Sequence, residues 1–321
     1  MKTKTRYILF SNKYEPQQCD ELNNKTPFDI MIGSEIVGEN FPHDDIEKKE
    51  GEWHNLDLES LKECIKKVCP SPKSVRFSNI KTREEMSDIL EIIKEDLISI
   101  NLFKCPDLSD FSFLESIPNL QFVNIFWNRK ATFLFNAGNM PNLKKFHMLD
   151  CNHVVNFDGL KNSNIEDLSL SGCNWLSSFV SKLDVGDLDF LEFMPKLKTL
   201  ELDIMHTRSD EFYLKAIAKA KTIESFKTRD KFFTFEQFAW LSAHLPNLKK
   251  GLEPCTYFFS WDNRGSEIVD GVDDYYIIGR GKTRAKKALA IRYQATYDAL
   301  KEHFKDVQDP PSVDFKCELK R

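Results

Sequence analysis

The stretch LISINLFKCPDLSDFSFLESIPN, residues 97–119, is followed by LQFVNIFWNRKATFLFNAGNMPN, residues 120–142, with the same apolar positions. Two further copies follow directly, LKKFHMLDCNHVVNFDGLKNSN from Leu143 and IEDLSLSGCNWLSSFVSKLD from Ile165. Each copy has apolar residues at positions 1, 4 and 6, and cysteine or asparagine at position 9. Because the successive starts are 23, 23 and 22 residues apart, the chain contains an internal repeat.

This pattern resembles the leucine-rich-repeat superfamily, whose unit reads L-x-x-L-x-L-x-x-[NC]-x-L. The repeat length resembles the short 22-23-residue unit of bacterial members. Weaker copies begin at Leu197 and Ile223, and a degenerate one lies around Val75, so the resemblance covers about residues 72–252. In this family the position-9 side chain points inward and satisfies backbone groups of the turn. The residues in that column are Cys105, Asn128, Cys151 and Cys173.

The repeat also has a physical explanation. Residues at positions 4 and 6 lie on one face of a short strand, and one strand alone cannot bury that face. Stacked repeats bury it in a continuous core. We therefore predict an α/β fold, a leucine-rich-repeat solenoid with a curved parallel sheet on its concave face and short helices and turns on its convex face.

The predicted domains are an N-terminal α+β capping region, a solenoid of about seven repeats, and a C-terminal cap with a hairpin and a long amphipathic helix. Their bounds are residues 1–71, 72–252 and 253–321. Helices are expected in the end repeats, where Thr82 and Thr234 match helix N-caps, and only single turns in the central ones. The remaining expected elements are strands at 6–10 and 28–32, helices at 58–68 and about 283–304, and a projecting loop at 181–190.

Positions 3, 5 and 7 of each repeat point away from the core, so they should line the concave face. In the N-terminal repeats these positions form an apolar ridge flanked by amides, which is typical of a protein-binding surface. We predict that the chain binds a protein partner there, as an inhibitor, an immunity-type factor or an effector. The ridge could instead be covered by the N-terminal segment or by the 181–190 insertion. The expected binding residues are Phe103, Phe122, Phe126, Asn101, Asn124, His147, Leu149, Glu201 and Asp203.

The string GRGKT at 279–283 resembles the end of a phosphate-binding loop, but tyrosine occupies position 276, where that loop needs its first glycine. The alternative function is therefore an enzyme, or a protein that binds nucleotides or anions through the basic segment 279–287. A solvated turn neutralised by nearby aspartates competes with that interpretation. We expect no enzymatic activity, no catalytic residues and no cofactor. The cations of this possible anion site are Arg280, Lys282, Arg284 and Lys286.

The amino-acid composition of the chain limits which classes of partner we expect. A formal net charge of -5 and a pI near 5.9 make nucleic acid an unexpected partner. The chain has no apolar run long enough for a signal peptide or a membrane span, and none of its eight cysteines forms a CxxC pair. We expect a monomeric cytoplasmic protein with reduced cysteines and no metal or membrane contact, with secretion by a signal-independent route left open.

Overall fold

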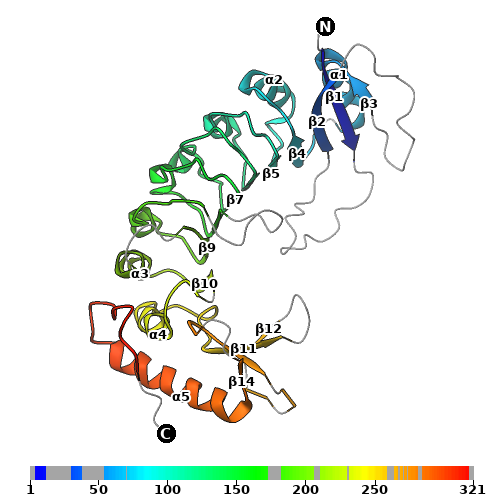
Figure 1. Ribbon diagram of the computed structural model, residues 1–321. Coiled ribbons are helices and arrows are strands. Elements are labelled where there is room, and N and C mark those ends of the chain that lie inside the picture. The colour runs from blue at the N-terminus through cyan, green and yellow to red at the C-terminus, as the bar shows by residue number, and fades with distance from the viewer. Residues whose placement is uncertain are drawn as a thin grey trace. The chain divides into compact units, whose positions relative to one another are not determined.

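The repeated pattern forms parallel strands in the computed structural model (Figure 1), which describes twelve segments of the chain. These segments are residues 4–11, 30–37, 54–69, 71–172, 182–205, 210–229, 231–258, 264–266, 268–269, 271–272, 274–280 and 284–317. Two units can be distinguished: unit 1 is Met1–Ile165 with Ser171–Leu183, and unit 2 is Glu166–Leu170 with Asp184–Arg321. The domain bounds expected at 71/72 and 252/253 stay predictions.

Unit 1 contains a mixed sheet in which the strands follow the order β3-β1-β2-β4-β5-β6-β7. Pairing is antiparallel from β3 to β2 and parallel from β2 to β7. In β5, β6 and β7 each repeat position pairs with the same position of the next repeat, as in Ser99 with Phe122 and Phe122 with Lys145. The bounds are β1 Lys4–Ser11, β2 Ile30–Val37, β3 His54–Leu56, β4 Ser74–Ser78, β5 Ser99–Phe103, β6 Phe122–Phe126 and β7 Lys145–Leu149.

Two helices of unit 1 were expected from their sequence signals. Helix α1 (Leu58–Val68) has exactly the predicted bounds. Helix α2 (Arg83–Ile93) begins after Thr82, whose side-chain oxygen accepts a hydrogen bond from the Glu85 N–H at 3.2 Å. This contact satisfies a backbone donor that the first helical turn leaves open, so the N-cap prediction is confirmed.

The repeats of unit 1 share one core. Residues at positions 1, 4 and 6 are buried in each, as in Leu97, Ile100 and Leu102 at 0 % exposure. The central repeats return through single 3-10 turns, which confirms that they are too short for an α-helix. These turns are η1 (Ser112–Ser116), η2 (Ala137–Asn139) and η3 (Asp158–Leu160).

The described position-9 side chains, Cys105, Asn128 and Cys151, are buried, and Asn128 bonds to the backbone as the family resemblance implied. The Asn128 amide donates to the carbonyl oxygens of Cys105 and Leu108 at 2.7 and 2.8 Å. Its carbonyl oxygen accepts from the N–H groups of Lys130 and Ala131 at 3.0 and 2.8 Å. One buried side chain therefore satisfies four backbone groups of two adjacent turns.

Unit 2 continues the pattern in β8 (Asp167–Ser171), β9 (Thr199–Asp203) and β10 (Ser225–Thr228), and β9 and β10 pair in parallel. A separate small sheet has the order β12-β11-β13-β14. In the described part of the chain, no helix has both the length and the apolar composition needed to cross a bilayer. The other elements are η4 (Asp189–Phe193), α3 (Asp210–Lys219), α4 (Phe235–His244), β11 (Cys255–Phe258), β12 (Arg264–Gly265), β13 (Tyr275–Ile277), β14 (Arg284–Ala285) and α5 (Lys287–Phe304).

The prediction that residues 181–190 project as a loop is wrong for the described part of this segment, which begins at residue 182. Leu183, Val185, Leu188 and Phe190 are buried, at 0 to 4 % exposure. Alternating apolar residues at these positions have enough surface to join the core, and burying them is favourable. This segment therefore belongs to the packed repeat.

The C-terminal helix α5 packs against α4, and Figure 1 shows the two helices side by side. The Phe235 ring meets the rings of Tyr293 and Tyr297 edge to face, at centroid distances of 5.5 and 5.3 Å. The Tyr297 hydroxyl donates to the Phe238 carbonyl oxygen at 3.0 Å. Helix α5 begins four residues later than expected, at Lys287. Of its predicted apolar side, Tyr293, Tyr297, Leu300 and Phe304 are buried, whereas Leu289 is partly exposed. The role of this helix as a cap stays a prediction.

Removing the Asn128 side chain tests the role of the position-9 column. We expect Asn128→Ala to lower the free energy of unfolding by roughly 3 kcal/mol, because three buried backbone groups and one partly buried group lose their partner. Urea unfolding followed by circular dichroism measures this change. Asn119→Ala is the matched control, since the exposed Asn119 amide donates one bond, to the Glu95 carbonyl oxygen. Equal losses in the two variants would contradict the assigned role.

Candidate functional site

The face of the unit 1 sheet that carries positions 3, 5 and 7 is organised in rows, because neighbouring strands pair position for position. At position 5 a polar row runs from Arg76 through Asn101 and Asn124 to His147. At position 7 the apolar row consists of Phe103, Phe126 and Leu149, three half-buried side chains. The register therefore brings together seven of the nine expected binding residues, with Phe122 at position 3.

The two amides of the polar row are not at the surface. Asn101 and Asn124 are only 1 % and 2 % exposed, which corrects the expected surface position. An asparagine is shorter than the phenylalanines beside it, so the rings of the apolar row and of Phe122 stand above it. The Phe122 ring in turn meets the His147 ring edge to face at 5.2 Å. The longer side chains are therefore the ones that a partner can reach.

The apolar row begins with a stack. The Phe103 and Phe126 rings lie 4.9 Å apart with an interplanar angle of 15°. The Arg76 guanidinium carbon lies 3.9 Å from the centre of the Phe103 ring, and burial lowers the pKa of Arg76 from its usual value. Since β5 lies between β4 and β6, the guanidinium and the Phe126 ring cover opposite faces of Phe103.

The residue that follows each of these strands has a left-handed backbone. The φ angles are 58° at Asn79, 52° at Lys104, 60° at Trp127 and 56° at Asp150. Asparagine and aspartate tolerate this conformation, whereas it is unfavourable for lysine and tryptophan. The Lys104 ammonium lies 5.2 Å from the centre of the Phe103 ring. Lys104 and Trp127 thus directly follow the apolar row at the carboxyl ends of β5 and β6.

Four residues of this surface were missed from the sequence: Arg76, Lys104, Trp127 and Arg129. The Arg129 guanidinium carbon lies 4.3 Å from the centre of a Trp127 ring, a cation–π contact. Arg76 occupies position 5 of the degenerate first copy, and Lys104 and Trp127 occupy position 8, which directly follows the strand. Extending the position-7 column by one residue would have found Lys104 and Trp127, and extending the position-5 column by one repeat would have found Arg76.

In unit 2 the equivalent positions carry paired charges. The Lys227 ammonium lies 2.8 Å from a Glu201 carboxylate oxygen. Arg229 holds both Asp203 oxygens, with Nε at 2.6 Å from Oδ1 and Nη2 at 2.9 Å from Oδ2. The expected binding residues Glu201 and Asp203 are therefore neutralised within their own sheet face, which makes this part less suited to charge-based recognition.

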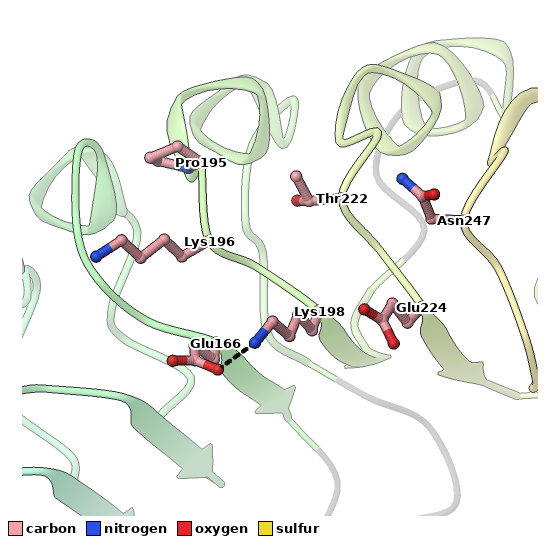
Figure 2. Close-up of a pocket in the computed structure, with 7 residues that line it drawn as sticks. All are labelled: Glu166, Pro195, Lys196, Lys198, Thr222, Glu224 and Asn247. Atoms are coloured by element: carbon pink, nitrogen blue, oxygen red, sulfur yellow. Dashed lines mark hydrogen bonds and ion pairs between the residues drawn. The ribbon is translucent and has the colours of Figure 1, made fainter.

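A depression of about 340 Å³ in unit 2 is shown in Figure 2. Lys198 donates to the Glu166 carboxylate at 2.7 Å, and this hydrogen bond is the main cause that raises the pKa of Lys198. A bond from Lys249 to Glu224 at 2.6 Å is the main cause that lowers the pKa of that carboxyl. Both carboxylates thus form ion pairs with lysines. The lining residues are Glu166, Pro195, Lys196, Lys198, Thr222, Glu224 and Asn247.

The described cations of the expected anion site, at 280–287, each contact a different residue. Arg280 lies 2.7 Å from the carboxylate of Glu236, which is 1 % exposed and also accepts a bond from the Cys317 N–H at 3.0 Å. The Arg284 guanidinium lies 5.4 Å from the centre of the Tyr276 ring. The third cation, Lys286, lies 3.3 Å from a carboxylate oxygen of Asp274, while Lys282 lies outside the described residues.

Gly279, the first residue of the GRGKT string, has a structural role. Its φ is +69°, and a side-chain carbon there would overlap the Phe235 backbone nitrogen. Glycine is therefore required for the close approach of this turn to the start of α4. The described cations of this segment hold the C-terminal region together, and their binding of an anion stays a prediction.

The described buried thiols lie in surroundings that favour their protonated form. Burial raises the pKa of Cys105 and Cys151 to about 12, and it does the same for Cys255. The Cys151 thiol approaches the carbonyl oxygen of Leu149 at 3.5 Å. Among the described residues, no three histidine, cysteine or acidic side chains are grouped so that they could hold a metal ion. Cys173, the fourth residue of the position-9 column, lies outside the described residues.

Comparisons with known proteins give a distant structural likeness. No family model and no curated protein matches the chain. The crystal structure of an internalin (inlF) from Listeria monocytogenes is similar over 55 % of this chain, with 16 % sequence identity and a TM-score of 0.39. The match spans 45 % of the length of that internalin. The functional proposal for this chain therefore rests on its own residues.

Thiol labelling tests the assignment of the buried cysteines. At about pH 8 a thiol with a pKa near 12 is almost entirely protonated and unreactive, so Cys105, Cys151 and Cys255 should label only after unfolding. The partly exposed Cys64 and Cys317 should label in the native protein and serve as internal controls. Peptide mass spectrometry after a short iodoacetamide pulse reads each site. Rapid native labelling of Cys151 would show that its thiol is accessible.

Proposed function

We propose that this chain is a leucine-rich-repeat solenoid that binds a protein partner on the concave face of its repeat sheet, centred on the apolar row of unit 1. The observation that carries the proposal is the stack of Phe103 on Phe126, continued by Leu149. A single half-exposed phenylalanine is ordinary, whereas a contiguous apolar row on a sheet face is typical of an interface.

The composition of the surface supports the same conclusion. Aromatic residues and arginine dominate the energetically important centres of protein interfaces. Here Trp127 directly follows Phe126 of the apolar row and forms a cation–π contact with Arg129, and Arg76 covers one face of Phe103. These side chains are already held in place by contacts with one another, so little of their conformational entropy would be lost when a partner binds.

Two substitutions test the function. Phe103→Asp and Phe126→Asp should reduce capture of the partner from the source cells by at least about 30-fold, corresponding to roughly 2 kcal/mol for an interface aromatic. The measurement is quantitative mass spectrometry of proteins retained by the immobilised full chain. Melting temperatures of the variants are recorded in parallel, since half-buried rings should tolerate replacement.

Phe133→Asp is the matched control, because Phe133 belongs to the same repeat as Phe126 but is 49 % exposed outside the strands. It should retain the full set of captured proteins. If Phe126→Asp and Phe133→Asp retain the same proteins in the same amounts, the apolar row is not the binding surface. Should Phe103→Asp unfold the protein, Phe103→Ala provides the milder test at the same position.

A further inference from the structure

Three cations surround the aromatic side chains of the unit 1 face. Arg76 and Lys104 lie 3.9 and 5.2 Å from the centre of the Phe103 ring, and Arg129 lies 4.3 Å from a Trp127 ring. Lys104 and Arg129 are exposed to solvent, so their charge is available at the surface. The apolar row is therefore bordered by positive charge at its carboxyl-end edge.

Among the described residues, no carboxylate forms an ion pair with Lys104 or Arg129. Asp107 lies 3.0 Å from the ammonium group of Lys130, a cation outside the group just described. Asp150 occupies the position next to Trp127 in the left-handed column and accepts a bond from the Asn152 amide at 3.0 Å. In this part of the described chain the aromatic rings are therefore bordered by two exposed cations without an ion pair, although the whole chain carries a net charge of -5.

The orientation of the rings points to the same kind of partner. Both faces of Phe103 are covered, by the Arg76 guanidinium on one side and the Phe126 ring on the other. A nucleobase or a sugar ring therefore has no free face of Phe103 on which to stack. The edge of a phenyl ring carries partial positive charge, so the uncovered edge favours oxygen atoms with negative charge.

The backbone at Lys104 and Trp127 adds an independent observation. Both residues are held in the left-handed conformation, at φ 52° and 60°, which L-residues with long side chains adopt at an energetic cost. At the same position the neighbouring repeats have Asn79 and Asp150, which tolerate it well. Asparagine at 104 and 127 would stabilise the fold, so the lysine and tryptophan there are suboptimal for stability alone.

We infer that the partner presents an acidic segment in which carboxylates alternate with aliphatic side chains, and that Lys104, Trp127 and Arg129 recognise it. This inference rests on the proposed function. The aliphatic groups pack on the apolar row, and the carboxylates approach the ring edges and the charged groups of Lys104 and Arg129. The strained backbone keeps Lys104 and Trp127 at the edge of that row, at the expense of stability.

The test uses the full chain and three fluorescent peptides, in which leucine alternates with glutamate, glutamine or lysine. Fluorescence anisotropy should show binding of the glutamate peptide, with a Kd that rises about tenfold when NaCl increases from about 50 to about 500 mM. The lysine peptide should not bind, and the glutamine peptide should bind about tenfold more weakly than the glutamate peptide.

Variants separate recognition from stability. Lys104→Asn and Trp127→Asn should each raise the melting temperature by about 2 °C, and each should weaken binding of the glutamate peptide about fivefold. Lys144→Gln is the matched control, because this exposed lysine of the same unit precedes β7 at the opposite end of the strands from Lys104, and it should leave the Kd unchanged. A change that stabilises the fold and weakens binding is not expected from a purely structural residue.

Three outcomes would overturn the inference: no binding of the glutamate peptide, equal binding of the glutamine peptide, or a lower melting temperature in both asparagine variants. Equal binding of the glutamate and glutamine peptides that is lost in Phe126→Asp would reject the acidic preference and leave the proposed function in place. Unchanged partner capture by Phe126→Asp would instead reject the proposed function itself.

Discussion

The structure depends on the position-for-position pairing of successive repeats in the unit 1 sheet. Residues at positions 4 and 6 must lie above one another to form a continuous core, and a shift by one residue would turn them to the opposite face. The same register aligns positions 5 and 7 on the other side of the sheet. The apolar row of Phe103, Phe126 and Leu149 is therefore a direct consequence of how the core is built.

The turns satisfy a second requirement, since each strand must leave the sheet at the same point in every repeat. Asn128 bonds four backbone groups from inside the turn. The left-handed residue after the strand redirects the chain, and its side chain lies beside the exposed end of the apolar row. Lys104 and Trp127 therefore have two roles. The fold requires their left-handed backbone, and their side chains lie at the surface where we propose that a partner binds.

Unit 2 uses the same repeat differently. Its sheet face carries the pairs of Glu201 with Lys227 and Asp203 with Arg229, whose charges offset one another. At its C-terminal end, buried Glu236 binds both Arg280 and the Cys317 N–H, joining α4 to the last segments of the chain. Removing one partner from a buried ion pair is strongly destabilising, so Arg280 contributes to the stability of the C-terminal region.

The sequence by itself determined the repeat, its register and which side of each strand is buried, because these follow from the spacing of apolar residues within a repeat. An amphipathic pattern predicted α1, and an N-cap at Thr82 predicted α2. The sequence also placed Phe103 and Phe126 in one row. Only the tertiary structure decided that Asn101 is covered, that Arg76 closes one face of Phe103, and that Lys104 is held in a strained conformation. These features depend on side-chain length and on contacts between neighbouring repeats, which periodicity within a single chain does not specify.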